Sequence, residues 1–367
     1  MESFFIYREP FEKVCHCYTQ PEKPTVISSL AALDGRKGFV IAPFYRDSSN
    51  TLYLLDGQNG SSTVLPLDGS KGFKAIPDWQ DETLLAGETT SLREIYHDDF
   101  CRFHKELECN TFRKLVLARS VVEAKDEGTT PRSIFLKACE RYPRSYIALF
   151  YTKETGMWLI ASPEVLLCGD ADGYQTMALA GTMKYEGEDM LWSAKNQEEQ
   201  QLVADYIRTC LQPFASEIAE SKPYTARAAH LAHLRTDFTF RLKDTQRLGS
   251  FLTAFHPTPA VCGMPKDEAQ QFILHNEQLN RGYYSGFSGL LGDNGMAKLY
   301  VTLRCMQISR SACRLYAGGG LLKESVEENE WQETEAKLDT MRQLLNHNYS
   351  YRHICLIGLI SLISQHP

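Results

Sequence analysis

Carboxylates recur at helical spacing in two separate stretches of the sequence. Glu330, Glu333 and Lys337 stand at i, i+3 and i+7, which places them on one stripe of a predicted helix. Lys195 and Glu199 stand at i and i+4 on a second predicted helix. Carboxylates that project from two helices toward one point form a hard oxygen site of the kind that Mg²⁺ prefers. The same pattern also fits two solvated helix faces with local ion pairs, and spacing alone leaves both interpretations open.

A lysine lies on the apolar side of a predicted strand. In the strand expected at Phe112–Ala124, Lys114 shares a face with Val116 and Ala118. A lysine on such a face is costly unless it is paired or neutral. It could be an edge-strand residue whose amine reaches solvent, or a desolvated amine that acts as a general base. The pattern does not decide between them.

Two turns between predicted strands carry polar groups. Glu164 follows Ser162 and Pro163, and a carboxyl buried there would have a raised pKa that suits a general acid. As a loop glutamate it could equally be solvated. The segment 178–182 is expected to be a strand that ends in a glycine turn, where backbone N–H groups can meet an anion.

The last third of the chain adds an arginine and a glycine run. Arg304 lies in an apolar segment expected to be one strand, 297–309, where it would be a buried ion-pair partner or a fork for a carboxylate. The run Gly318-Gly319-Gly320 precedes the final helix and allows backbone to approach a ligand closely.

The composition limits the classes of function. The chain has 367 residues, a formal net charge of −7 and no basic block, which argues against a nucleic-acid partner. An acidic protein that binds an anion needs local positive charge or a metal. The eleven cysteines are scattered, and the N-terminus lacks the pattern of a signal peptide, so we expect reduced thiols and a cytoplasmic location. The apolar stretch 354–364 is too short to span a bilayer, so no membrane association is expected.

The elements that must position these residues follow an α+β pattern. Neighbouring strands are joined by short turns, which predicts antiparallel sheets, and the helices come in separate blocks. No linker-like stretch interrupts the chain, so we expect one large domain over residues 1–347 and a C-terminal tail, 348–367, of unknown role. The predicted helices are 91–109, 131–142, 189–219, 246–255, 265–278 and 326–345. The predicted strands are 38–44, 51–55, 62–67, 112–124, 146–151, 157–161, 165–168, 174–180, 284–291, 297–309 and 313–317.

An ordered series of segments resembles the chorismate-utilising enzymes, a family that includes isochorismate, salicylate, anthranilate and aminodeoxychorismate synthases. The series covers about residues 100–345, and its members are RKLVLAR (113–119), SPEVLL (162–167), LAGT (179–182), KNQEEQQLV (195–203), HLRTDF (233–238), HPTPAVCG (256–263), RGYYSG (281–286), LRC (303–305), YAGGG (316–320) and EWQETEAKL (330–338). The resemblance implies a fold of two antiparallel sheets packed face to face with helices outside.

The resemblance also implies a role for each matching residue. Lys114 matches the base that activates water for attack at C2 of chorismate, and Glu164 matches the acid that protonates the departing C4 hydroxyl. Glu199 and Glu333 match ligands of Mg²⁺, with Glu330 as an outer or water-mediated partner. Positions that match substrate contacts are Gly181, Thr182, Ala260, Tyr284, Arg304, Gly318 and Lys337, with Arg304 and Tyr284 facing the enolpyruvyl carboxylate.

Within the family, the resemblance favours isochorismate synthesis. Members that use ammonia generally lack the lysine at the position of Lys114, which points to water as the nucleophile. Salicylate synthases keep that lysine but tend to carry threonine where this chain has Ala260, and they also eliminate pyruvate. We therefore expect a Mg²⁺-dependent isomerase that feeds menaquinone or siderophore synthesis, acting as a monomer without a glutaminase subunit. A salicylate synthase and an aminating enzyme are the alternatives.

Overall fold

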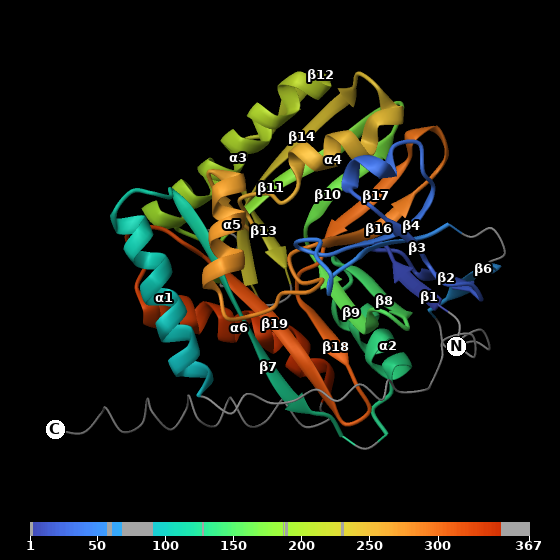
Figure 1. The fold of residues 1–367 in the computed structure, drawn as a ribbon, viewed down its shortest axis with the longest axis horizontal. Coiled ribbons are helices and arrows are strands. Elements are labelled where there is room, and N and C mark those ends of the chain that lie inside the picture. The colour runs from blue at the N-terminus through green and yellow to red at the C-terminus, as the bar shows by residue number, and fades with distance from the viewer. Residues whose placement is uncertain are drawn as a thin grey trace.

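Two antiparallel β-sheets form the centre of the molecule and lie face to face (Figure 1). The computed structural model describes residues 3–56, 61–67, 91–126, 128–185, 187, 190–228 and 231–345. Every strand pair in these ranges is antiparallel. The predicted α+β fold of two face-to-face sheets is thus confirmed.

One sheet has nine strands and is built from distant parts of the chain. Across the sheet they are β15 (Gly263–Met264), β7 (Lys114–Ala124), β19 (Ala312–Leu321), β18 (Cys305–Ile308), β9 (Gly156–Ser162), β8 (Tyr146–Thr152), β1 (Ser3–Arg8), β2 (Val14–Gln20) and β6 (Ser61–Pro66).

The other sheet has ten strands. In order they are β12 (Ala215–Glu220), β14 (Leu231–Leu242), β11 (Gly173–Lys184), β10 (Val165–Asp170), β17 (Ala297–Val301), β16 (Phe287–Leu291), β4 (Gly38–Ala42), β5 (Leu52–Leu55) and β3 (Thr25–Ile27), and β13 (Tyr224–Ala228) also pairs with β14.

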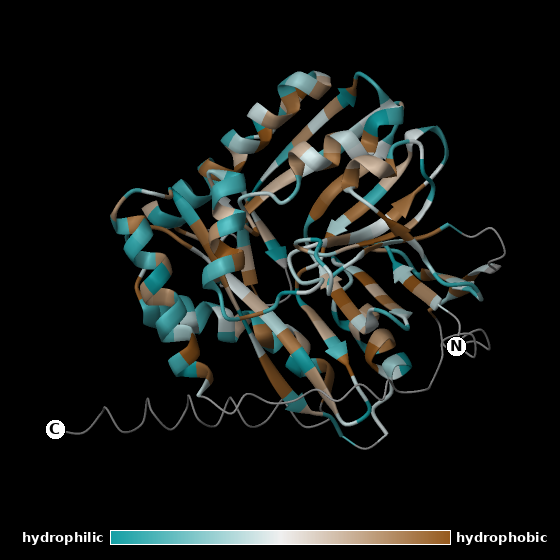
Figure 2. Cartoon of the chain, viewed as in Figure 1, coloured by the Kyte–Doolittle hydropathy of each residue, from teal (hydrophilic) through white to brown (hydrophobic). Residues whose placement is uncertain are grey.

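Helices cover the outer face of each sheet, with their apolar sides turned inward (Figure 2). Helices α3 (Ala194–Phe214) and α4 (Leu248–Phe255) pack on the ten-stranded sheet. Helices α2 (Pro131–Arg141) and α6 (Glu327–Leu345) pack on the nine-stranded sheet. Helices α1 (Leu92–Glu108) and α5 (Lys266–Asn276) lie against β7. None of the helices in the described ranges is long and apolar enough to cross a membrane.

Aromatic side chains fill the space between the sheets. Tyr146 of β8 stacks on Tyr300 of β17 with ring centroids 4.0 Å apart, and Phe5 of β1 stacks on Phe39 of β4 at 3.7 Å. Each pair joins one sheet to the other. Aromatic rings bury much apolar surface in few torsions, so they fix the two sheets as one unit.

Several predicted element boundaries are wrong. The helix expected from residue 189 begins at Ala194, and the strand expected from residue 284 begins at Phe287. The helix expected to reach residue 219 ends at Phe214, because the next six residues form β12 and pair with β14. The strand expected to end at a turn near Gly181 continues to Lys184. It accommodates Gly181 as a bulge, with a register shift against β14 and φ +70° at the glycine. The predicted tail 348–367, with its apolar stretch, lies outside the described residues.

The predicted strand 297–309 is two strands that belong to different sheets. β17 ends at Val301 in the ten-stranded sheet, and β18 begins at Cys305 in the nine-stranded one. Arg304 lies between them with φ +46°, so the expectation of a strand arginine is wrong. The chain crosses from sheet to sheet at this residue, and that crossing puts the Arg304 side chain beside the gap between the sheets.

Candidate active site

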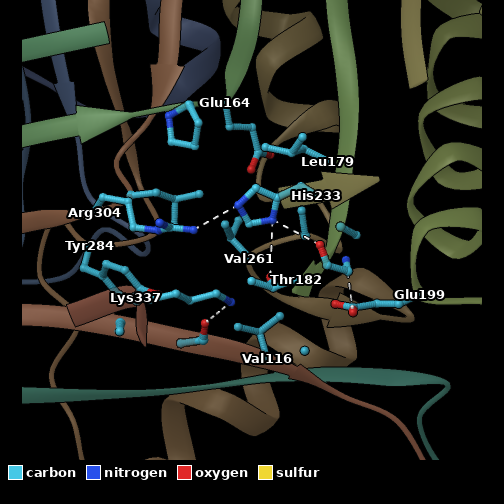
Figure 3. A pocket seen from close by; sticks show the side chains of 18 of the residues that line it. Val116, Glu164, Leu179, Thr182, Glu199, His233, Val261, Tyr284, Arg304 and Lys337 are labelled. Atoms are coloured by element: carbon cyan, nitrogen blue, oxygen red, sulfur yellow. Dashed lines mark hydrogen bonds between the residues drawn. The ribbon is translucent and has the colours of Figure 1, made fainter. Parts of the chain in front are cut away.

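A pocket lies where the two sheets meet, enclosed by segments that are far apart in the sequence (Figure 3). Its cavity of about 60 Å³ is smaller than the roughly 300 Å³ at the low end of small-molecule sites. Side chains therefore have to move apart before a ligand of substrate size can enter. Nine of the predicted site residues line it: Glu164, Gly181, Thr182, Glu199, Ala260, Tyr284, Arg304, Gly318 and Lys337.

Lys114 lies directly behind this lining and is buried completely. Its Nζ is 2.9 Å from Oε1 of Glu199, an ion pair between β7 and α3. The two groups are not aligned as a hydrogen bond. The amine of Lys114 has no hydrogen-bond partner among the described residues. The alternative in which this lysine reaches solvent is therefore wrong.

A glycine makes room for this ion pair. A Cβ atom at Gly320 would lie 2.0 Å from Oε1 of Glu199 and 2.8 Å from Cε of Lys114. Both distances are shorter than ordinary Cβ contacts, so a side chain at that position would displace the ends of Glu199 and Lys114. The glycine run that the sequence analysis singled out thus admits the lysine and the carboxylate to the pocket.

Glu164 is the second buried carboxyl of the pocket. It lies in the short connection between β9 and β10, where its N–H donates to Oγ of Ser162 at 3.2 Å and its C=O accepts from the N–H of Val301 at 3.1 Å. Burial raises the pKa of Glu164 to about 8, against the opposing pull of Lys114, Lys337 and Arg304. Glu164 is therefore mostly protonated at neutral pH, the direction of shift expected from the sequence for a general acid.

A histidine that the sequence analysis did not select holds Arg304 in place. Nη2 of Arg304 donates to Nε2 of His233 at 3.0 Å, and Nδ1 of His233 donates to the C=O of Gly181 at 3.0 Å (Figure 3). Burial, and after it the nearby Arg304 and Lys337, lower the pKa of His233 well below its usual value. The ring is therefore neutral, and its two hydrogen bonds fix the tautomer.

Arg304 and Tyr284 lie on one side of the pocket. Burial lowers the pKa of Arg304 to about 10, so the guanidinium remains charged near neutral pH. A buried guanidinium is suited to bind a carboxylate in two-point fashion. Tyr284 is buried next to the glycine run, where a Cβ at Gly318 would lie 2.8 Å from its hydroxyl.

The predicted metal ligands of α6 are each paired with a lysine. Oε1 of Glu333 accepts from Nζ of Lys337 at 2.6 Å, and that amine also donates to the C=O of Gly318 at 2.8 Å. Glu330 is ion-paired with Lys195 of α3. The described residues contain no group of three or more His, Cys, Asp or Glu that could hold a metal as they stand.

The donor set nevertheless fits a divalent cation. Oε2 of Glu330 is buried and has no hydrogen-bond partner among the described residues. A Cβ at Gly319 would lie 3.5 Å from this oxygen and 3.6 Å from Oε1 of Glu333, so both carboxylates face the same point. Hard oxygen donors with an unused lone pair are what Mg²⁺ binds. A cation that binds here has to compete with lysines for the carboxylate oxygens.

Charges are tightly coupled in this cluster. Burial raises the pKa of Glu199, but Lys114 and Lys195 more than offset it, so the carboxyl remains ionised. Burial raises the pKa of Glu330 despite Lys195, and Glu333 adds to the increase. Burial alone would lower the pKa of Lys195, but Glu330 and Glu199 raise it above its usual value. Lys195 was noted in the sequence only for its helical spacing, and in the structure its side chain joins α3 to Glu330 of α6.

Comparison with known proteins gives the family. The model of the family described as "Chorismate binding enzyme" matches residues 77–346. The chain belongs to this family of chorismate-binding enzymes. The chain is 39% identical over 200 residues to the Salicylate biosynthesis isochorismate synthase of Pseudomonas aeruginosa, a match that covers 52% of this chain and 42% of that protein. It is 35% identical over 253 residues to Isochorismate synthase DhbC of Bacillus subtilis, covering 63% of this chain and 62% of that protein.

These matches span less than two thirds of the length of either relative. Among solved structures, the chain superimposes on MenF, the menaquinone-specific isochorismate synthase from Escherichia coli, with a TM-score of 0.75. That superposition covers 94% of this chain and 89% of MenF at 22% identity, so it establishes the fold.

Proposed function

We propose that this chorismate-binding enzyme is an isochorismate synthase, which moves a hydroxyl group of chorismate from C4 to C2 with Mg²⁺ present. One observation carries the proposal: a buried lysine amine and a buried carboxyl of pKa about 8 lie at the same pocket. The reaction needs a base at one end of the ring and an acid at the other. The names of the relatives support the same activity.

Lys114 is the proposed base. Its amine takes a proton from water as the oxygen of that water forms a bond to C2, and this requires the amine to be neutral and free of Glu199. Glu164 is the proposed acid. Its carboxyl gives a proton to the C4 hydroxyl as the C4–O bond breaks, so the leaving group departs as water. No electron acceptor or second substrate is needed.

The remaining polar groups bind and orient the substrate. Arg304, held by His233, and Tyr284 are proposed to bind the enolpyruvyl carboxylate. Thr182 and the backbone around Gly181 also line the pocket. Lys337 would supply a further positive charge. Local cations of this kind explain how a chain of net charge −7 can bind a dianion.

Glu199 and Glu333 are the proposed ligands of Mg²⁺, with Glu330 as an outer partner. When bound, the ion would hold the ring carboxylate of chorismate and neutralise its charge. Oε1 of Glu199 is paired with Lys114 and its Oε2 accepts from the N–H of Gly181 at 3.2 Å, so a bound cation would share this carboxylate with the proposed base. The metal site and the base are therefore coupled through one carboxylate.

The test is the product formed from chorismate and Mg²⁺ without ammonia, separated by chromatography. Isochorismate, formed reversibly, supports the proposal. Salicylate with an equal amount of pyruvate would instead support a salicylate synthase, and anthranilate or aminodeoxychorismate would support an aminating enzyme. Lys114→Ala and Glu164→Gln should each lower turnover by about 10²-fold or more. Lys153→Ala and Glu154→Gln, the same substitutions at exposed turn positions, should retain it.

We further propose that the enzyme acts in the cytoplasm as a monomer and needs no glutaminase subunit, since water is its nucleophile. Sedimentation of the purified chain gives the oligomeric state, and turnover by the chain alone tests the need for a subunit. Whether its product enters a menaquinone or a siderophore pathway is decided by which downstream enzyme consumes it in the cell.

A further inference from the structure

Two side chains complete an edge of β7, the strand that carries the proposed base. β7 pairs with β19 along one edge, whereas β15 covers only its first two residues on the other edge. Beyond β15 the C=O of Val116 accepts from Nη2 of Arg281 at 2.6 Å. The N–H of Ala118 donates to Oε1 of Glu277 at 2.8 Å. Arg281 and Glu277 therefore take the place of a strand, because buried backbone groups at a sheet edge need hydrogen-bond partners.

Arg281 and Glu277 form a buried ion pair in the connection between α5 and β16. Their side chains are 3% and 1% exposed. Nε and Nη2 of Arg281 donate to the two oxygens of Glu277 at 2.6 and 2.8 Å, and this two-point contact fixes the plane of the guanidinium. The guanidinium also lies over the ring of Phe44, 4.4 Å from its centroid. Arg281 is the first residue of the RGYYSG segment, in which only Tyr284 has a proposed role.

The guanidinium of Arg281 also joins β7 to another wall of the pocket. Nη1 donates to the C=O of Val261 at 2.9 Å, while Nη2 holds the C=O of Val116. The C=O of Arg281 in turn accepts from the N–H of Tyr284 at 2.9 Å. Val116, Val261 and Tyr284 all line the pocket. Because a guanidinium is planar and rigid, it sets the spacing between the two carbonyls.

The position of β7 determines where the proposed base lies. Lys114 and Val116 are two residues apart on this strand and share one face, so a shift of Val116 carries the Lys114 amine with it. β15 and the hydrogen bond from the N–H of Val116 to the C=O of Cys262 at 2.7 Å hold the start of the strand. The ion pair continues this hold as far as Ala118. A misplacement of about 1 Å can cost about 10²-fold in rate.

We propose that Arg281 and Glu277 are positioning residues, which hold the base on β7 at a fixed distance from the pocket wall at Val261 and Tyr284. This inference rests on the proposed function for the role of Lys114. Neither Arg281 nor Glu277 lines the pocket, so the pair acts through other residues. Loss of the pair should lower kcat and leave KM little changed, because the residues that bind the substrate remain.

The experiment compares Arg281→Lys with Arg8→Lys in the full-length protein with Mg²⁺. Lysine keeps the positive charge but lacks the rigid fork that binds two carbonyls and a carboxylate together. Arg8 is a matched control because it is 1% exposed and donates to the C=O groups of Pro143 and Tyr142, both at 2.7 Å. It does not line the pocket. Turnover of chorismate gives kcat and KM, and urea unfolding gives the fraction of folded protein.

Arg281→Lys should lower kcat by at least about 10-fold, with KM within about 3-fold of that of the wild type. Arg8→Lys should retain the kcat of the wild type, although both variants should unfold at lower urea concentrations. The positioning role is overturned if Arg281→Lys keeps wild-type kcat per folded molecule, or if both variants lose kcat equally. A loss confined to KM would also overturn it.

A second pair of variants decides the question if Arg281→Lys does not fold. Glu277→Gln keeps an acceptor for the N–H of Ala118 but removes the charge that fixes Arg281, so the same loss of kcat is expected. Its control is Glu123→Gln, which removes a charge paired with Arg342 near the other end of β7 and should retain kcat. A wild type that converts chorismate to another product would refute the proposed activity, while kcat still decides the role of the pair. Failure of the wild type to consume chorismate would overturn both.

Discussion

The protonation of Glu164 can be tested through the stability of the protein. Its pKa rises from an ordinary 4.5 to about 8 because the carboxyl is buried. Each pKa unit corresponds to about 1.4 kcal/mol, so full ionisation of this group should cost the fold about 5 kcal/mol. Between about pH 4.5 and about pH 8 the folded state binds this proton and the unfolded state does not. The contribution of Glu164 to the free energy of unfolding is therefore greatest below about pH 4.5 and is lost as pH rises to about 8.

Glu164→Gln removes this titration while it keeps the shape of the side chain. The difference in unfolding free energy, variant minus wild type, should increase by about 1.4 kcal/mol for each unit of pH between about 5 and 8. Urea unfolding at a series of pH values measures it, and subtraction cancels all other titrating groups. Glu154→Gln is the control, and its curve should run parallel to that of the wild type. If the Glu164→Gln curve is also parallel, Glu164 is ionised in the fold and is not the acid.

Three further predictions concern the lysine–glutamate cluster. Lys114→Met should lower the free energy of unfolding by about 3 kcal/mol because it leaves the buried Glu199 carboxylate unpaired. The double variant Lys114→Met/Glu199→Gln should recover most of that loss, as measured by denaturant unfolding. A Lys114→Met variant as stable as wild type would contradict the pairing. Glu199→Gln and Glu333→Gln should each weaken Mg²⁺ binding by at least about 10-fold in calorimetry. The circular dichroism spectrum of each variant should remain that of the wild type. A variant with unchanged Mg²⁺ affinity would reject the substituted residue as a ligand. Gly320→Ala should abolish turnover because its Cβ displaces Glu199 and Lys114. Gly319→Ala should retain activity because its Cβ would lie 3.5 and 3.6 Å from the nearest side-chain oxygens. The reverse order of activities in a turnover assay would refute this placement.

The resemblance to the chorismate-utilising enzymes predicted nine of the residues that line the pocket, whereas local periodicity left the role of each one open. The helical spacing of Glu330, Glu333 and Lys337 does put them on one stripe of α6. The apolar face around Lys114 indicated a costly position, and the structure buries the amine completely. What spacing did not reveal is the partner of each group, because ion pairs such as that of Lys114 with Glu199 join elements 85 residues apart.

The wrong elements have a common physical cause. The apolar run 297–309 is continuous in composition, so it gives no sign that the chain leaves one sheet and enters the other at Arg304. A positive φ at a non-glycine residue is set by tertiary contacts and not by local preference. Strand β14 was not predicted at all, since Arg235, Asp237 and Arg241 interrupt its apolar pattern. Its order comes from three neighbouring strands that pair with it.

The crossing at Arg304 also explains how two helices on different sheets can act at one point. β18 begins just after the crossing and pairs with β19 as far as Tyr316, while β7 continues along β19 to Leu321. Beyond Tyr316 the C=O of Gly318 accepts from Lys337 of α6 in place of a strand. The edge of β19 is therefore open to α6 along the glycine run.

The glycine run itself then determines what reaches each face of that strand. Gly320 faces Glu199 and Lys114, and Gly319, on the opposite face, faces Glu330 and Glu333. Lys195 spans from α3 to the α6 side by pairing with Glu330. Carboxylates from both helices thus approach the same short piece of backbone from its two sides. A side chain at position 320 would displace Glu199 and Lys114, so the approach of α3 to this backbone depends on the glycine there.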